Sequence, residues 1–231
     1  MKVSIRGPIV SSNVHRFYRY VGMEATSPQS VADAIAKGNG ERAEVEINSG
    51  GGDIFAASEI YTTLKNYSGG VHIRIVGLAA SAASVIAMAG ESEMTPTGMM
   101  MIHNVQSYAD GDYRAMEHTA SVLRLANSTI ASAYRTKTGR PEKEITDMMD
   151  AETWITADKA VELGLVDRVM DMDDGQLAMT ADYCAGMLGA EAIERIKNMC
   201  ECGEKNPCFA EREAAKLRAE LDFLRLRRLT R

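Results

Sequence analysis

A serine at position 81 stands where two very different stretches of sequence meet. Residues 71–76 (VHIRIV) are rich in β-branched side chains and predict a strand, whereas residues 78–90 are mostly small and predict a helix. The first N–H groups of a helix lack partners within the helix and carry partial positive charge, so a negatively charged oxygen can bind there. Ser81 is therefore a candidate nucleophile beside a site for an oxyanion. The alternative is that Ser81 only caps the helix, with Ser84 one turn further along.

A glycine-rich turn offers a second source of backbone N–H groups. Residues 49–53 (SGGGD) lie between a strand-like stretch and an amphipathic stretch. They match neither G-x-G-x-x-G nor a P-loop, and Asp53 would repel a phosphate. Glycine lets the backbone approach another chain closely and adopt a positive φ. The turn is therefore predicted to bind a peptide edge or an oxyanion rather than a nucleotide.

His103 is the candidate base. It follows the apolar residues 99–102, which places it at the end of a buried segment. A neutral imidazole in such a place can accept the proton of a serine and so activate it. A histidine behind an apolar run can equally be a buried group whose hydrogen bonds are satisfied locally. The pattern leaves both interpretations open.

Strand-like and helix-like stretches alternate along the chain. Ser27 followed by Pro28 predicts a helix start, and residues 138–141 (TGRP) predict a helix end. The alternation predicts a parallel sheet with crossover helices, which is an α/β fold. The expected strands are residues 3–7, 43–48, 71–76 and 165–170, and the expected helices are residues 28–38, 54–65, 78–90, 112–137, 142–149 and 157–163.

The composition is that of an ordinary globular protein. Of the 231 residues, 45% are hydrophobic and 25% are charged, which argues against disorder. The formal net charge of −6 gives no general attraction to nucleic acid or to an anionic membrane, so neither partner is expected. The sequence has no apolar run of about eighteen residues and no secretory signal at its start. We therefore expect a cytoplasmic protein.

Four blocks of sequence occur in a fixed order, namely residues 47–53 (INSGGGD), 77–82 (GLAASA), 101–104 (MIHN) and 154–167 (WITADKAVELGLVD). Together they closely resemble the proteolytic subunit of the Clp protease, ClpP, over residues 3–171. The resemblance implies a ClpP/crotonase-like fold of repeated βα units, a serine endopeptidase acting on peptides or proteins, and self-assembly into rings that enclose the active sites. No cofactor or metal is expected. Residues 1–172 would form this protease domain, and residues 173–231 a helical C-terminal extension.

The resemblance also implies roles for particular residues. The family's nucleophile falls on Ser81 and its general base on His103. Its oxyanion donors fall on the backbone N–H groups of Gly52 and Ala82, where small residues leave room. The serine would attack the scissile carbonyl carbon, and the histidine would take the proton and pass it to the leaving amine.

The third member of the triad departs from the family pattern. An ungapped match from Gly139 places Glu152 where the family usually has aspartate. Asp150 lies two residues away and is the alternative acid, because residues two apart on an extended segment share a face. We favour Glu152, since its longer side chain can still reach a ring nitrogen.

Further departures indicate a subtype. Gly50 stands where housekeeping ClpP has proline, Asp53 replaces an apolar residue, and an extension follows the core. These features look more like the ClpP-related proteases of phages and prophages, which process capsid or scaffold proteins during head maturation. One alternative is a housekeeping ATP-dependent Clp subunit that works with an AAA+ ATPase. Others are a crotonase-fold acyl-CoA enzyme and a ring scaffold with an inactive site.

The C-terminal extension holds every cysteine of the chain. Four thiolates can bind zinc, but the spacing contains no C-x-x-C pair, so reduced thiols without metal are expected. Residues 211–226 carry apolar side chains at coiled-coil spacing, over a length too short to be stable alone, and a basic tail follows. The cysteines are Cys184, Cys200, Cys202 and Cys208.

The long helix expected at residues 112–137 has an apolar face interrupted by small residues, which allow close approach between subunits. We expect it to build a homo-oligomer, as the family's handle segment does. The alternative is a helix that only covers its own domain. A monomer would leave Met148, Met149 and Trp154 unsupported beside the site, whereas closed symmetry would cover them and hide the active sites.

Overall fold

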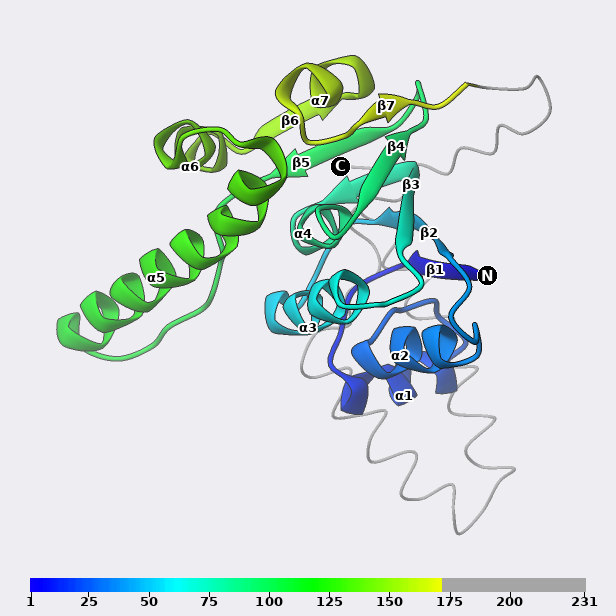
Figure 1. Ribbon diagram of the computed structural model, residues 1–231. Coiled ribbons are helices and arrows are strands. Elements are labelled where there is room, and N and C mark those ends of the chain that lie inside the picture. Colours follow the sequence, from blue (N-terminus) through cyan, green and yellow to red (C-terminus); the bar gives the residue numbers. More distant parts are fainter. Residues whose placement is uncertain (172–231) are drawn as a thin grey trace, which may run out of the picture.

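The computed structural model of the protein describes residues 1–171 (Figure 1). The expected C-terminal extension, with its four cysteines, its zinc alternative and its coiled-coil segment, lies outside the described residues. The expected division between residues 1–172 and 173–231 therefore stays a prediction.

One seven-stranded sheet forms the centre of the described part of the chain. Its main strand order is β1-β2-β3-β4-β7, and β5 pairs with both β3 and β6. The pairing is parallel throughout except between β5 and β6. Parallel strands joined by crossover helices confirm the predicted α/β fold. The strands are β1 (Lys2–Arg6), β2 (Ala43–Ser49), β3 (Val71–Ala80), β4 (Glu91–Met94), β5 (Met99–Ile102), β6 (Thr153–Thr156) and β7 (Arg168–Val169).

Helices cover one face of this sheet. In Figure 1, α2 lies against β1 and α4 against β2 and β3, with α3 between the two helices. Alternate side chains of the three strands point toward these helices and are buried, which supplies the main hydrophobic stabilisation. No helix within residues 1–171 has the length and apolar character needed to cross a membrane. The helices are α1 (Ser12–Tyr20), α2 (Pro28–Ala36), α3 (Ile54–Lys65), α4 (Ala82–Ala87), α5 (Tyr113–Thr138), α6 (Glu142–Asp150) and α7 (Ala157–Leu163).

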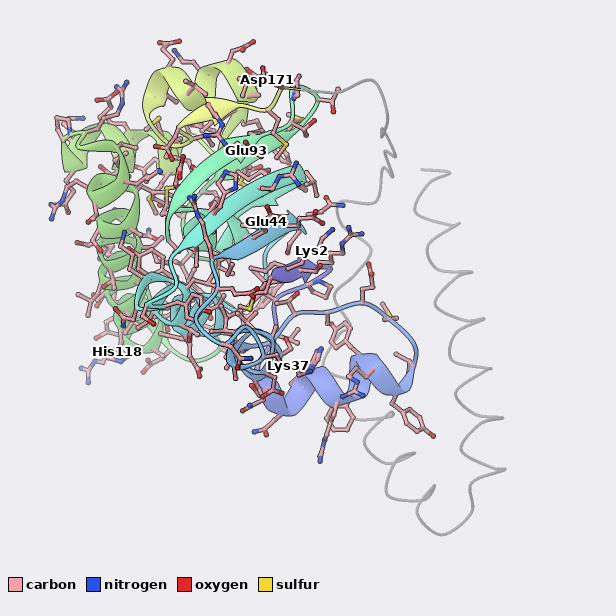
Figure 2. The ribbon with its side chains drawn as sticks, turned by 45° about the vertical axis from the view of Figure 1, so that its right-hand side comes forward. Lys2, Lys37, Glu44, Glu93, His118 and Asp171 are labelled. Carbon is pink, nitrogen blue, oxygen red and sulfur yellow. The ribbon has the colours of Figure 1, made fainter. Side chains whose placement is uncertain are left out.

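The opposite face of the sheet carries charged side chains that neutralise one another. The parallel register sets Arg74 between Glu46 and Glu93. Arg74 Nε donates to Glu93 at 2.8 Å. Lys2 Nζ lies 2.7 Å from a carboxylate oxygen of Glu46. Lys2, Glu44 and Glu93 mark this face in Figure 2. Because each is paired, Glu46 and Glu93 lie nearly buried without an uncompensated charge.

The predicted helix boundaries are confirmed at two places. Ser27 caps α2 by accepting from the N–H of Ser30, and Pro28 occupies the first turn. Gly139 ends α5 in the left-handed conformation with φ 69°. Both ends therefore follow the local rules of helix capping.

β3 is longer than the sequence predicts. It spans Val71–Ala80 rather than residues 71–76. Residues 78–80 pair with residues 99–101 of β5. Alanine on its own favours a helix, but pairing within a sheet outweighs that preference here. As a result, Ser81 is the first residue after the strand.

Smaller differences also reflect tertiary context. Helix α1 was not expected, and α4 ends at Ala87, short of the predicted end of its helix. The strand expected at residues 165–170 is reduced to Arg168–Val169. Its first residues instead donate their N–H groups to the carbonyl of Ala160, which closes the end of α7.

α5 reaches away from the sheet in Figure 1. Its buried residues are Ala131, Ala133 and Tyr134, all near its C-terminal end. In the outer part, Val122 is 50% exposed and Leu125 is 70% exposed. The outer part of α5 therefore does not cover its own domain, and its role as a contact between subunits stays a prediction.

The three residues that were expected to be exposed in a monomer, Met148, Met149 and Trp154, differ in their burial. Met149 is buried within its own chain, so that part of the expectation is wrong. Met148 is partly buried against the core. Trp154 is 41% exposed. Met149 is buried because it lies on the face of α6 that packs against the core. The sequence predicted this helix but not which of its faces would be buried.

The exposed outer part of α5 predicts self-association. Apolar side chains grouped on a projecting helix are stabilised when another subunit covers them. Light scattering at micromolar concentration should give a mass that is a multiple of the 25.1 kDa chain. Leu125→Glu should lower that mass, because a charge would be buried at the contact.

Leu125→Met is the matched control, since it keeps an apolar side chain of similar volume, and it should leave the mass unchanged. A wild-type mass of one chain, or a Leu125→Glu variant that assembles normally, would contradict the assignment of α5 as the contact.

Candidate active site

Ser81 has an unusual backbone conformation. Its φ of 54° and ψ of −124° lie in a region that non-glycine residues rarely adopt. Such a conformation costs about 1–3 kcal/mol and persists only where the surroundings hold it. On one side, the Ser81 N–H donates to the carbonyl of Met101 on β5 at 2.8 Å. The sharp turn from β3 into α4 therefore presents the hydroxyl at the end of the strand.

The Ser81 side chain does not cap α4. Instead, its Oγ lies 2.7 Å from Nε2 of His103. The interpretation of Ser81 as only a helix cap is therefore wrong. The alternative that His103 is a buried histidine with only local hydrogen bonds also fails, because its ring contacts Ser81, 22 positions away.

The sheet register brings these two residues together. Ala80 pairs with Met101 in the parallel β3–β5 ladder, so Ser81 and His103 leave the same edge of the sheet. The carboxyl ends of neighbouring parallel strands are a common place for functional groups in α/β proteins. The serine and the histidine, 22 positions apart in sequence, thus become neighbours through one strand pairing.

Burial lowers the pKa of His103 below its usual value of 6.5, and the negative charge of Glu152 acts in the opposite direction but is the smaller effect. At neutral pH the ring is therefore mainly uncharged. A neutral imidazole that carries its proton on Nδ1 leaves Nε2 free to accept from the Ser81 hydroxyl. This is the protonation state that a general base requires.

Glu152 lies beside His103 because of a second strand pairing. β5 and β6 run antiparallel with Ile102 opposite Thr153, so the next positions on the two strands are His103 and Glu152. Glu152 has a φ of 47°, which marks a sharp turn between α6 and β6. The turn places its carboxylate where its charge acts on the imidazole.

Asp150, the alternative acid, has a different setting. It is the last residue of α6, so the premise that it shares an extended segment with Glu152 is wrong. Helix α6 ends at Asp150, one residue beyond the predicted end at Met149. Asp150 Oδ1 accepts a hydrogen bond from Asn104 Nδ2 at 2.7 Å. It therefore contacts the neighbour of His103 rather than the ring itself.

The glycine-rich turn packs directly against the serine. A β-carbon at Gly51 would lie 2.7 Å from the Ala80 carbonyl oxygen and 2.9 Å from the Ala82 nitrogen. Gly52 has a φ of 146°, and a β-carbon there would clash with the backbone of Ile9. No side chain fits at either glycine. The backbone of the turn therefore lies directly against Ser81. The oxyanion role of the N–H groups of Gly52 and Ala82 stays a prediction.

Asp53 has a role that sequence reasoning missed. Its carboxylate accepts from the N–H groups of Phe55 and Ala56 and so caps α3. Asp53 therefore stabilises the N-terminus of the helix that follows the glycine-rich turn. The signal was present in the sequence, because aspartate directly before an amphipathic stretch is a common N-cap.

Asn48 was also missed. Its Oδ1 accepts from the Leu78 N–H at 3.1 Å, at the place where the β2–β3 register shifts. A β-carbon at Gly77 would lie 2.6 Å from the same oxygen. Asn48 thus fixes the last part of β3, which leads into Ser81. Within residues 1–171, no group of three histidine, cysteine, aspartate or glutamate side chains could hold a metal ion.

Sequence comparison gives the family context of this site. The chain matches the Clp protease family over residues 34–173. It is similar to ATP-dependent Clp protease proteolytic subunit 1 of Salinibacter ruber, with 28% identity over 139 residues, which is 59% of this chain and 60% of the relative. The corresponding protein of Chlamydia caviae is 29% identical over 159 residues, covering 64% of this chain and 83% of the relative.

A further relative is the ATP-dependent Clp protease proteolytic subunit of Bacteroides fragilis, 30% identical over 134 residues, which cover 57% of this chain and 65% of the relative. The chain thus spans less than two thirds of the Salinibacter and Bacteroides relatives. The match to the family itself covers more than half of this chain, from before β2 to the end of β7. The protein therefore belongs to the Clp protease family.

Proposed function

We propose that this protein is a serine endopeptidase in which Ser81 is the nucleophile, His103 the general base and Glu152 the acid. The observation that carries the proposal is the 2.7 Å contact between Ser81 Oγ and His103 Nε2 at a strained strand-to-helix turn. Residues with strained backbone conformations are more frequent at catalytic sites, where the surrounding structure stabilises them.

The proposed reaction follows the geometry. Ser81 Oγ attacks the scissile carbonyl carbon while His103 Nε2 takes its proton. The carbonyl oxygen becomes an oxyanion and accepts hydrogen bonds from the N–H groups of Gly52 and Ala82. The intermediate collapses when His103 gives the proton to the leaving amine. A water molecule then attacks the acyl-serine by the same route and frees the enzyme.

In this mechanism Glu152 stabilises the imidazolium that forms during the reaction and keeps the neutral ring in the tautomer with its proton on Nδ1. The charge of Glu152 already acts on His103 in the resting site. Asp150 remains the alternative acid, but its hydrogen bond to Asn104 favours a supporting role.

Two other functions are less well supported. A crotonase-fold acyl-CoA enzyme also uses backbone N–H groups for an oxyanion, but it needs no serine–histidine pair. An inactive ring scaffold would not need the Ser81–His103 contact or the strain that goes with it. Tight binding of coenzyme A would favour the first alternative.

The substrate and the assembly are finer parts of the proposal. We infer that the chain forms rings that enclose its active sites in the cytoplasm, and that it processes phage capsid or scaffold proteins. The departures at Gly50 and Asp53 support the phage type. The curated relatives are named as ATP-dependent subunits, which supports the alternative of a housekeeping subunit fed by an AAA+ ATPase.

Changing Ser81 to alanine should abolish peptide hydrolysis and labelling by a fluorophosphonate, because it removes the oxygen that would form the acyl intermediate. The assembled mass should not change. Fluorogenic peptides, labelling followed by mass spectrometry, and light scattering give the three readouts. If a different serine of the wild type were labelled, Ser81 would not be the nucleophile and the proposal would be overturned.

The pH profile tests the base and the acid together. Since burial lowers the pKa of His103, the acidic limb of kcat/KM should have its midpoint below 6.5. Glu152→Gln removes the charge that raises this pKa, so the limb should move to still lower pH. Turnover should also fall at every pH, by up to about 10⁴-fold, as loss of a triad acid can cause.

Asp150→Asn is the matched control for that variant. It removes one negative charge two positions away and keeps an oxygen that can accept from Asn104. It should leave the acidic limb and most of the turnover in place. The reverse outcome, with a large loss in Asp150→Asn and little change in Glu152→Gln, would assign the acid to Asp150.

Product sizes distinguish the two substrate classes. A processing protease should cut an unfolded test protein without ATP at a few positions, giving discrete fragments in mass spectrometry. A subunit fed by an ATPase should reduce a folded protein to short peptides only when ATP and an AAA+ partner are present. The second pattern would contradict the proposed capsid or scaffold substrate.

A further inference from the structure

Two buried hydroxyl groups lie directly behind the nucleophile. Ser84 on α4 has no exposed surface, and Tyr134 near the end of α5 is 1% exposed. Ser84 Oγ lies 2.6 Å from the Ser81 carbonyl oxygen and 2.7 Å from the Tyr134 hydroxyl. The two residues are 50 positions apart in sequence, so this contact depends on how α5 packs on α4.

The direction of the hydrogen bonds follows from counting protons. A serine hydroxyl has one hydrogen, and Ser84 donates it to the Ser81 carbonyl. The Tyr134 hydroxyl must therefore be the donor to Ser84 Oγ. Burial raises the pKa of Tyr134 well above its usual range, so the phenol keeps this hydrogen at every pH at which the enzyme can work. The chain of donors runs from Tyr134 through Ser84 to the carbonyl of Ser81.

That carbonyl belongs to the peptide unit that carries the Ala82 N–H. Because a peptide unit is planar, fixing the oxygen of Ser81 also fixes the direction of the N–H of Ala82. In the proposed mechanism this N–H donates to the oxyanion. Hydrogen bonds in a chain also polarise one another, which makes the N–H on the same peptide a better donor.

The turn needs such support. On its β3 side, the Ser81 N–H is held by Met101. On its α4 side, the Ser81 carbonyl accepts from the N–H of Ser84 at 3.0 Å and from the Ser84 hydroxyl. Helix α4 is only six residues long, and its first two residues are alanines, which offer no other polar anchor.

We propose that Tyr134 and Ser84 form a positioning relay that aims the Ala82 N–H at the developing oxyanion and holds Ser81 in its strained conformation. This inference rests on the proposed peptidase function. Neither residue touches the substrate, and both act through the peptide unit between Ser81 and Ala82.

A purely structural role makes a different prediction. In that case the two hydroxyls only satisfy each other where α5 packs on α4. Their removal would then change stability, while the active fraction would keep its turnover and its oxyanion stabilisation. The two roles can therefore be separated by comparing catalysis with unfolding.

The experiment uses the full-length chain in four variants: Ser84→Ala, Tyr134→Phe, the double variant, and Ile86→Val. Ile86→Val is the control, because it removes one methyl group from the buried side of the same helix and touches no polar atom of the relay. Each variant is measured for urea unfolding, for kcat and KM with a fluorogenic peptide, and for inhibition by a peptide aldehyde. The aldehyde forms a tetrahedral adduct with Ser81 whose oxygen occupies the oxyanion site.

The relay predicts a specific pattern. Ser84→Ala should lower kcat about 10- to 100-fold, since small misplacements of catalytic groups cost this much. KM should change by less than about 2-fold, because the interaction is made mainly in the transition state. Aldehyde affinity should fall in parallel with kcat. Tyr134→Phe should give a smaller loss, because Ser84 still donates to Ser81.

The double variant separates catalysis from stability. Ser84→Ala alone leaves the Tyr134 hydroxyl buried without a partner, whereas the double variant removes both partners and should recover much of the lost stability. Its kcat should nevertheless remain as low as that of Ser84→Ala. If Ser84→Ala does not fold, the double variant and Tyr134→Phe still decide the question.

Two negative outcomes are distinguishable. If the wild type hydrolyses peptides and the double variant matches Ile86→Val in kcat and aldehyde affinity, the relay is refuted and the proposed function stands. If the wild type neither hydrolyses peptides nor labels at Ser81, the proposed function itself is refuted.

Discussion

The strained backbone of Ser81 is the constraint on which the rest of the site depends. A residue other than glycine keeps a φ of 54° only if several independent contacts stabilise that conformation. The Met101 carbonyl holds its N–H, the turn at Gly51 packs against its side chain, and Ser84 holds its carbonyl. Each contact comes from a different element. The geometry of Ser81 is therefore a property of the assembled sheet and helices, and not of the local sequence.

β3 makes this assembly possible because it changes partner along its length. Its first half pairs with β4, and residues 78–80 pair with β5. The change occurs at Gly77, where a side chain would meet Asn48. Asn48 in turn accepts from the next N–H along β3. This bend brings the end of β3 beside the end of β5, so the serine and the histidine meet at one edge of the sheet.

Residues that obey local rules could be predicted from the sequence. The α/β class, the cap at Ser27 and the end of α5 at Gly139 are examples, since a few neighbouring residues determine each of them. The proximity of Ser81 and His103 was expected, because both belong to short motifs that occur in a fixed order. The length of β3, the inner face of α6 and the Ser84–Tyr134 pair were not found, because each depends on contacts across many positions. A serine and a tyrosine 50 residues apart carry no signal before the fold joins them.

The electrostatics of the site are compatible with the proposed use of a glutamate in an exposed turn, where the family usually has aspartate. Desolvation is the larger effect on the pKa of His103, so burial, and not the charge of Glu152, favours the neutral imidazole. An exposed carboxylate is screened by water and exerts a modest pull on the imidazole pKa. In the proposed mechanism the carboxylate of Glu152 would orient the ring and stabilise the imidazolium during the reaction, and both roles depend on its position more than on its burial. The antiparallel pairing of β5 with β6 ends at Ile102 and Thr153, so the backbone register brings position 152 next to His103 whether glutamate or aspartate stands there.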